Sequence, residues 1–151
     1  MKRCLLLAAL LLTITGCGGY QLSGVVLHSK TAGIFIVDAN DSRLNNIGVG
    51  NVVINVTIDP TSLGLKKLPK VLSDEQGRFS IPVDEVGAGV LEYEARVLAR
   101  RNGYRYVEDL ISLPSQKKRL LILMEPGRDT YKAPDDPIGE TLRSQGQFDD
   151  R

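Results

Sequence analysis

A short stretch in the middle of the chain, 73–81, constrains the fold most strongly, because it has the pattern of a tight turn between two strands. Asp74 suits such a turn since its side chain accepts hydrogen bonds from backbone N–H groups ahead of it, and Gly77 adopts the positive φ that a short connection requires. Phe79 then alternates with polar neighbours in the period of a half-buried strand. We therefore predict a structural turn at Asp74, Gly77 and Phe79 rather than a catalytic site.

Other segments on both sides of this turn also have strand patterns. The clearest is 51–59, where Val52, Ile54, Val56 and Ile58 fall on one face and β-branched residues dominate. Further strands are predicted within 21–30 and at 34–37, 78–83, 90–99, 104–107 and 120–124. About seven short strands at regular spacing, with turn signals such as Asn102-Gly103 between them, predict an all-β fold, an antiparallel β-sandwich.

The amino terminus has the pattern of a targeting segment. Met1-Lys2-Arg3 is a positive start, and an apolar run from Cys4 to Leu12 follows that is too short to span a bilayer. Ile14-Thr15-Gly16-Cys17 then gives an aliphatic residue, two small residues and a cysteine. An ordinary secretory signal with an incidental cysteine is the alternative interpretation.

The run 14–17 resembles the lipobox of bacterial lipoproteins. The resemblance implies cleavage between Gly16 and Cys17, a diacylglycerol on the Cys17 thiol, and a fatty acyl chain such as palmitate on the new amine. Several acyl chains make membrane anchoring stable. In that family an aspartate after the cysteine favours retention in the inner membrane. Gly18 stands there instead, which implies an outer-membrane lipoprotein facing the periplasm.

Composition divides the chain into four segments. We predict a signal peptide at 1–16, a lipidated flexible leader at 17–23, the β-sandwich at 24–126, and a polar, disordered tail at 127–151. Pro134 and Pro137 interrupt the tail, and a short helix is possible after Asp136. The tail is expected to be separable from the fold.

The order of motifs within the sandwich resembles the carboxypeptidase regulatory-like domain. The matching runs are 73–82, with its aspartate-glycine turn and Phe79, then 91–97, then Asn102-Gly103-Tyr104, then 121–123 before Pro126. The resemblance covers about 50–126 and implies a transthyretin-like (prealbumin-like) sandwich. Either 24–26 or 34–37 matches the family's opening strand. Domains of this family are usually noncatalytic accessory or adhesive modules.

Charge and reactive side chains exclude several classes of function. Lys+Arg number 19 against Asp+Glu 18, so the chain lacks the basic excess of a nucleic-acid binder. Of the two cysteines, Cys4 leaves with the signal and Cys17 is lipidated, so no thiol remains for catalysis, metal or a disulfide. His28 is the only histidine, which excludes a multi-histidine centre. We expect no cofactor.

Three groups of polar residues are weak candidates for binding. Asp38, Asn40 and Asp41 lie in one loop and offer oxygens to Ca²⁺, but the spacing is not that of an EF-hand, and an ordinary loop is favoured. Two basic groups suit anionic headgroups or an acidic polymer, or protect strand edges from pairing. They are Lys66, Lys67 and Lys70, and Lys117, Lys118 and Arg119.

These observations predict a membrane-anchored lipoprotein of the cell envelope with a noncatalytic binding or structural module. Its partners are the membrane, through Cys17, and an envelope protein or polymer. The alternatives are an envelope enzyme or enzyme accessory subunit, for which the sequence offers no catalytic constellation, and a small-ligand carrier. A filled sandwich interior would oppose the carrier.

Overall fold

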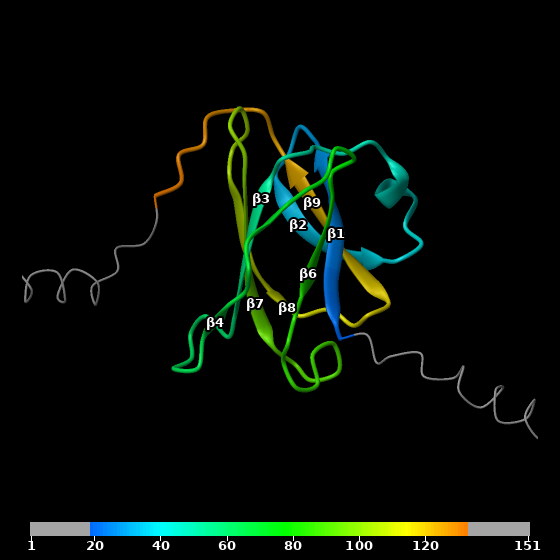
Figure 1. Cartoon of the computed structure of the whole chain (residues 1–151). Helices are drawn as coiled ribbons and strands as arrows, with labels where there is room; N and C mark the ends of the chain where they lie inside the picture. Colours follow the sequence, from blue (N-terminus) through cyan, green and yellow to red (C-terminus); the bar gives the residue numbers. More distant parts are fainter. Residues whose placement is uncertain (1–18, 133–151) are drawn as a thin grey trace, which may run out of the picture.

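The protein is a sandwich of two β-sheets in a computed structural model that describes residues 19–132 (Figure 1). Sheet A contains β1 (Gln21–His28), β2 (Gly33–Asp38), β6 (Arg78–Pro82) and β9 (Lys118–Met124). Sheet B contains β3 (Val53–Ile58), β4 (Lys66–Lys67), β5 (Val71–Leu72), β7 (Glu94–Arg100) and β8 (Val107–Ser112). A 3-10 helix, η1 (Ser42–Asn45), lies between β2 and β3. The predicted all-β sandwich is confirmed.

Most neighbouring strands run antiparallel, with one exception. Sheet A has the order β2-β9-β1-β6, and β1 pairs with β9 in parallel, so that Val26 lies opposite Ile122. Sheet B has the order β4-β3-β7-β8, with β5 also paired to β3, and all its pairs are antiparallel. The parallel pair is possible because the chain crosses through sheet B between β1 and β9, and a parallel pair needs such a long connection.

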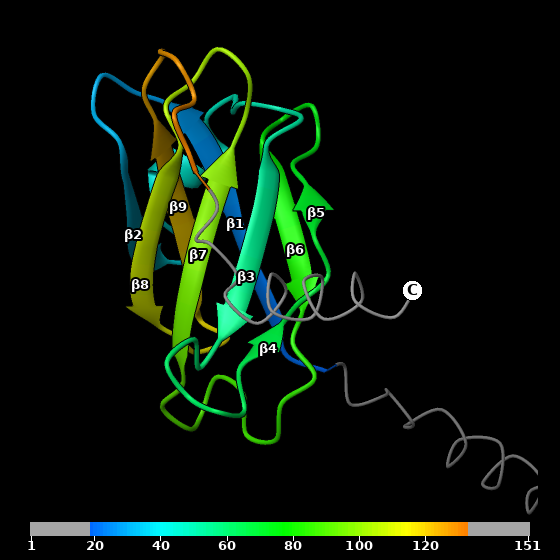
Figure 2. The same ribbon diagram turned by 90° about the vertical axis from the view of Figure 1, so that its left-hand side faces the viewer.

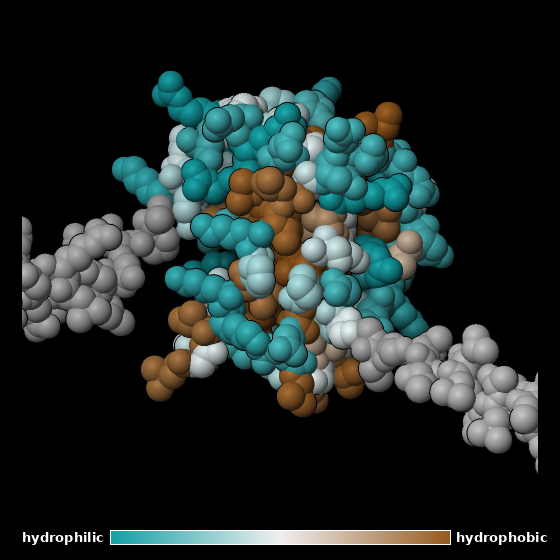
Figure 3. Space-filling view, in the orientation of Figure 1, coloured by the Kyte–Doolittle hydropathy of each residue, from teal (hydrophilic) through white to brown (hydrophobic). Residues whose placement is uncertain are grey.

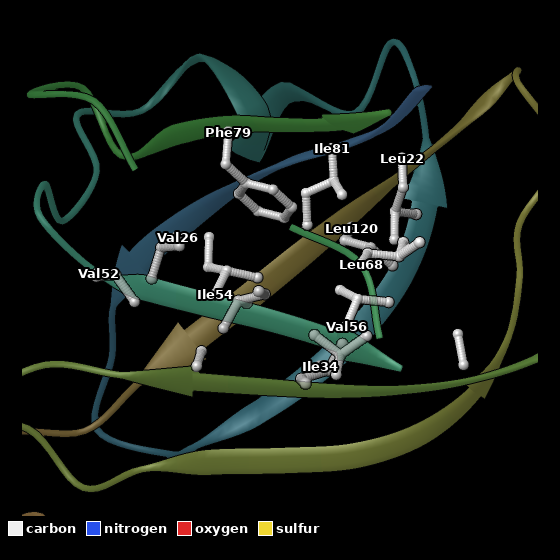
Figure 4. Close-up of a cluster of buried hydrophobic side chains, with 14 of the residues drawn as sticks. Leu22, Val26, Ile34, Val52, Ile54, Val56, Leu68, Phe79, Ile81 and Leu120 are labelled. Atoms are coloured by element: carbon white, nitrogen blue, oxygen red, sulfur yellow. The ribbon is translucent and has the colours of Figure 1, made fainter. Parts of the chain in front are cut away.

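The core lies between the two sheets and is filled by aliphatic side chains (Figure 4). Period-2 alternation brings one face of each strand inward, as in β3, where Ile54, Val56 and Ile58 are buried. Phe79 of β6 is also buried in this core. Removal of this apolar surface from water is the main stabilising contribution, about 25 cal/mol for each Å².

The fold begins inside the segment 17–23 that composition predicts as a flexible leader. Leu22 is only 1% exposed and lies opposite Ile81 in the β1–β6 pair. Tyr20 is 7% exposed, and its backbone carbonyl accepts a hydrogen bond from the Val83 N–H at 3.0 Å. The predicted boundary at 24 is therefore wrong, because burial of these two side chains depends on strands that are distant in sequence.

The predicted strand at 90–99 begins later, at Glu94. Residues before it form a loop in which the Tyr93 hydroxyl donates to the Val86 carbonyl at 2.8 Å. Leu91 is exposed, whereas the alternation predicts it to face inward. The Ala88 N–H donates to the Glu85 carbonyl, and the Val90 N–H donates to the Gly87 carbonyl. These two successive turns hold the segment away from the sheet. Local turn formation therefore outweighs the strand pattern before Glu94.

The described chain also continues past the predicted end of the sandwich at 126. The Gly127 N–H donates to the Gly103 carbonyl at 3.0 Å, and the Asp129 carboxylate accepts from Arg100 Nε at 2.8 Å. Figure 2 shows this segment passing over the outer face of sheet B, in front of β7. Residues 127–132 thus pack on the sandwich, while the rest of the predicted tail, including its possible helix, lies outside the described residues.

Candidate functional site

The predicted turn has a structural geometry. Asp74 Oδ1 accepts hydrogen bonds from the backbone N–H groups of Gln76 at 3.0 Å and Arg78 at 2.7 Å. Gly77 has φ of 79°, and a Cβ at this residue would lie 2.5 Å from the Val26 carbonyl oxygen. Only glycine fits this approach between the turn and β1. Two backbone hydrogen bonds therefore occupy the Asp74 side chain, and we interpret the turn as a structural element of the fold.

The acidic loop does not gather its oxygens around one point. Asp41 caps η1 and accepts from Arg43 through the backbone N–H at 2.9 Å and the guanidinium at 2.7 Å. These hydrogen bonds lower the pKa of Asp41 to about 2. Asp38 instead pairs with Lys118 at 2.8 Å, and Asn40 is exposed. Within residues 19–132, no group of three or more metal-ligating side chains of the His, Cys, Asp or Glu type comes together.

His28 lies at the end of β1 against Tyr104. The two rings are perpendicular, with centroids 6.0 Å apart, and the Tyr104 hydroxyl lies 3.5 Å from His28 Nδ1. The contact joins β1 to the loop after β7. It gives this histidine a packing partner at the surface.

In each of the two basic groups, some side chains are bound to neighbouring residues of this chain and others are exposed. Lys66 donates to the Asp84 carbonyl and pairs with Glu85, both at 2.8 Å, and the Glu85 carboxylate raises the pKa of Lys66. Lys118 pairs with Asp38, and Arg119 donates to two backbone carbonyls nearby. Lys67, Lys70 and Lys117 are exposed. Neither group forms one continuous cationic site.

A hollow of about 410 Å³ on the outer face of sheet B combines polar side chains from several segments. β3 and β7 place Asn55 and Arg100 there, because both residues face away from the core. The other polar side chains that line it come from the loop before β3, the β4–β5 loop, the loop after β7 and the C-terminal segment: Asn51, Lys70, Arg101, Asn102 and Asp129. Three cationic side chains therefore face one carboxylate.

The contacts of this hollow fix Arg100 and leave Asn55 unpaired. Asp129 binds Arg100, and the Tyr131 ring lies 4.7 Å from the Arg100 guanidinium. Burial acts to raise the pKa of Asp129, but hydrogen bonds from the Tyr131 backbone and from Arg100 outweigh it and lower that pKa. Asn55 Oδ1 is buried without a hydrogen-bond partner among the described residues. A buried acceptor without a donor costs free energy, so a ligand N–H would be stabilised there.

A second hollow, of about 270 Å³, lies on sheet A. Its cationic side chains are Arg78 and Arg119, and its apolar lining includes Leu44 and Phe79. Arg119 is already engaged with the Gln116 and Lys118 carbonyls. The hollow on sheet B therefore has the larger set of uncommitted polar groups.

Sequence patterns did not find the sheet B hollow as a site. In the sequence, Asn55 and the arginines at 100–101 have the pattern of ordinary outward-facing residues. They come together because β3 and β7, which are distant in sequence, pair with Val53 opposite Arg100. The predicted lipidation and cleavage residues, Cys17 and Gly16, lie outside the described residues. Among the residues that the structure describes, no helix is long and apolar enough to cross a membrane.

Comparison with known proteins assigns no family. No family model matches the chain, and no curated protein matches it either.

Proposed function

We propose that this protein is a lipid-anchored lipoprotein of the cell envelope whose β-sandwich is a noncatalytic binding or structural module. The observation that carries the proposal is the lipobox-like run Ile14-Thr15-Gly16-Cys17 directly after a charged start and an apolar segment. Gly18 after the cysteine favours the outer membrane, with the domain facing the periplasm. The resemblance to the carboxypeptidase regulatory-like domain supports a transthyretin-like module without catalysis.

The folded chain begins very close to the proposed anchor. Tyr20 is already buried, and only Gly18 and Gly19 separate it from Cys17. The lipid therefore holds the sandwich at the membrane surface rather than on a long tether. This arrangement suits a module that works within the envelope at a fixed distance from the bilayer.

The sheet B hollow is the surface that suits an envelope partner best. Lys70 and Arg101 are cationic side chains beside the unpaired Asn55 oxygen, and Arg100 is held in place by Asp129. The two cationic side chains favour carboxylate or phosphate groups of an envelope protein or polymer, whereas the Asn55 oxygen, an acceptor, would pair with an N–H of the same partner. The alternative of a small ligand inside the sandwich is disfavoured, because aliphatic side chains fill the interior (Figure 4).

Replacement of the anchor tests the proposal. Cys17→Ser should prevent lipidation and move the protein from the membrane fraction to the soluble envelope fraction. Recovery of Cys17→Ser in the membrane fraction, with unchanged processing, would contradict the lipoprotein assignment.

A second experiment tests the binding surface. We expect Lys70→Ala with Arg101→Ala to reduce capture of anionic envelope polymer severalfold, whereas the control Lys30→Ala retains it. Lys30 is a suitable control because it is exposed and lies in a different loop, between β1 and β2. Equal capture by all variants would remove the hollow from the proposal.

A further inference from the structure

One end of the sandwich carries exposed apolar side chains at the tips of its loops. Three loops meet there: 59–65 after β3, 83–93 after β6, and 113–117 after β8. Val86 and Val90 are each 87% exposed, and Leu63 is fully exposed. Leu65 and Leu91 are also exposed in the same loops. We call Leu63, Leu65, Val86, Val90 and Leu91 the apolar tips. Figure 3 shows apolar surface at this lower end of the molecule.

The same end contains the entry of the chain into the fold. The Tyr20 hydroxyl donates to the Pro114 carbonyl in the 113–117 loop. A Cβ at Gly89, in the 83–93 loop, would lie 2.6 Å from the Tyr20 ring. Lys66, directly after the 59–65 loop, binds Asp84 and Glu85. These contacts place the first described residues and the loops with the apolar tips at one end, as Figure 1 shows.

Chain length then restricts what can lie below this end. Cys17 precedes Tyr20 by three residues, which span at most about 11 Å when fully extended. The interfacial layer of one leaflet is about 5–8 Å thick. A lipid on Cys17 therefore holds Tyr20, and the loops around it, within reach of the headgroups.

The charges at this end do not favour attraction to one type of lipid. Lys66 is paired with Glu85, and both signs occur in the loops and beside them. The charged residues within the loops are Asp59, Asp84, Glu85, Glu92 and Lys117, and those directly after them are Lys66, Lys67, Glu94 and Lys118. Apolar contact, not electrostatic attraction, is then the stabilising interaction.

The opposite end differs in character. Its loop tips, 29–32, 74–77 and 101–103, contain mainly polar residues and glycine. Two exposed aliphatic side chains lie beside them: Leu72, 60% exposed, precedes the 74–77 turn, and Ile47 is 90% exposed, with the next residue, Gly48, donating to the Gln76 carbonyl. Ile47 therefore provides a matched control, with an exposed fraction close to that of Val90, at the other end.

We infer that the apolar tips dock on the phospholipid bilayer to which Cys17 is anchored, so that the sandwich stands on its N-terminal end with its opposite end directed away from the membrane. The inference rests on the proposed lipidation. Docking fixes the orientation of the domain, and it leaves the sheet B hollow, which lies toward the opposite end, open to a partner.

Labels at single cysteines test this orientation. Cys4 leaves with the signal and the Cys17 thiol carries the lipid, so an introduced cysteine is the only free thiol in the mature protein. The full-length lipidated protein is labelled with an environment-sensitive dye at Leu63→Cys, Val90→Cys or, as the control, Ile47→Cys. Each variant is reconstituted in protein-free vesicles of phosphatidylcholine, with and without phosphatidylglycerol.

The inference predicts that dyes at 63 and 90 are quenched severalfold more slowly by a water-soluble quencher than the dye at 47, in both lipid mixtures. Leu63→Ser should then increase quenching of the dye at 90, whereas Ile47→Ser should not. Equal quenching at 63, 90 and 47 on protein that floats with the vesicles overturns the docking alone. Failure of the unlabelled protein to float with vesicles overturns the proposed anchor instead, so the two failures are distinguishable.

Discussion

The hydroxyl of Tyr20, the first buried residue of the fold, donates a hydrogen bond to the carbonyl oxygen of Pro114, 94 residues further along the chain. The bond joins the start of β1 to the loop before β9, and these two strands are the parallel pair of sheet A. Tyr20 therefore fixes the N-terminal end of the sandwich at the point where the proposed lipid anchor begins.

Tyr20→Phe should change the pH dependence of stability. Burial raises the pKa of Tyr20 to about 12 from its ordinary value of 10.0, with Arg119 acting in the opposite direction. The folded state thus favours the neutral phenol, and this contribution to stability is present below about pH 10 and lost as pH rises through about 12. At neutral pH the variant should lose about 0.5–1.5 kcal/mol with the hydrogen bond.

Denaturant melts across this pH window provide the measurement. We expect the stability advantage of the wild type over Tyr20→Phe to fall as pH rises from about 10 to about 12, by up to about 2–3 kcal/mol, and therefore to change sign. The two proteins differ only at this side chain, so the difference isolates Tyr20. A constant difference from pH 8 to about 12 would contradict the assigned burial of the phenol.

Gly77→Ala should be more destabilising than Gly103→Ala. Both glycines have positive φ, 79° and 85°, so alanine is strained at either position. A Cβ at Gly77 would also meet the backbone of Val26 and Gly48, whereas nothing lies within 4 Å of a Cβ at Gly103. The excess cost at Gly77 should be about 1–3 kcal/mol by urea denaturation, the usual range for overpacking. Equal costs would show that the chain relaxes around Gly77.

The Phe79 and Asp74 substitutions should separate packing from turn formation. Phe79→Ala removes a buried ring and should cost about 3–5 kcal/mol. Asp74→Ala removes an acceptor of two backbone hydrogen bonds at an exposed turn and should cost less, about 0.5–1.5 kcal/mol. Thermal and urea melts test this order. If Asp74→Ala retained full stability but lost partner binding, the turn would be a functional site.

Truncation should locate the end of the fold at the 127–132 segment. A chain that ends after Lys132 keeps the Asp129–Arg100 pair and the Tyr131 contact, whereas a chain that ends after Arg128 loses both. The second truncation should therefore cost about 1–2 kcal/mol more than the first, which calorimetry would detect. Equal melting temperatures would show that this segment contributes nothing to stability, as composition alone predicts.

The pH dependence of Asp129→Asn should support the same contacts. The pKa of Asp129 is lowered in the folded state, so its contribution to stability is present above the ordinary carboxyl pKa of 3.8 and is lost as pH falls through the folded value. The difference in unfolding free energy between wild type and Asp129→Asn should therefore vanish in acid. A difference that does not decrease as pH falls below the ordinary carboxyl pKa of 3.8 would contradict the ion pair with Arg100.

The parts of the fold that depend on local pattern could be read from the sequence, and those that depend on distant pairing could not. Strict alternation in 51–59 and the aspartate-glycine turn at 74–77 are local, so β3 and the turn before β6 follow from them. The burial of Leu22 against β6 and the packing of Asp129 on β7 require contacts between distant segments. Composition therefore placed both ends of the domain too far inward.

The sheet B hollow illustrates the same limit at the level of a site. Asn55 and Arg100 lie on adjacent strands because β3 and β7 pair in one particular register, which no local pattern fixes. A polar outward face was visible in each strand separately. The sequence pattern does not show that the polar faces of β3 and β7 lie side by side, or that the C-terminal segment covers them.

The most direct test of the central claim is the mass of the N-terminal peptide of the protein purified from its native membranes. We expect a peptide that begins at Cys17 and carries a diacylglycerol on sulfur, with a fatty acyl chain on the amine. A peptide that retains residues 1–16, or one that begins elsewhere with an unmodified Cys17, would contradict the lipid anchor and the function proposed from it.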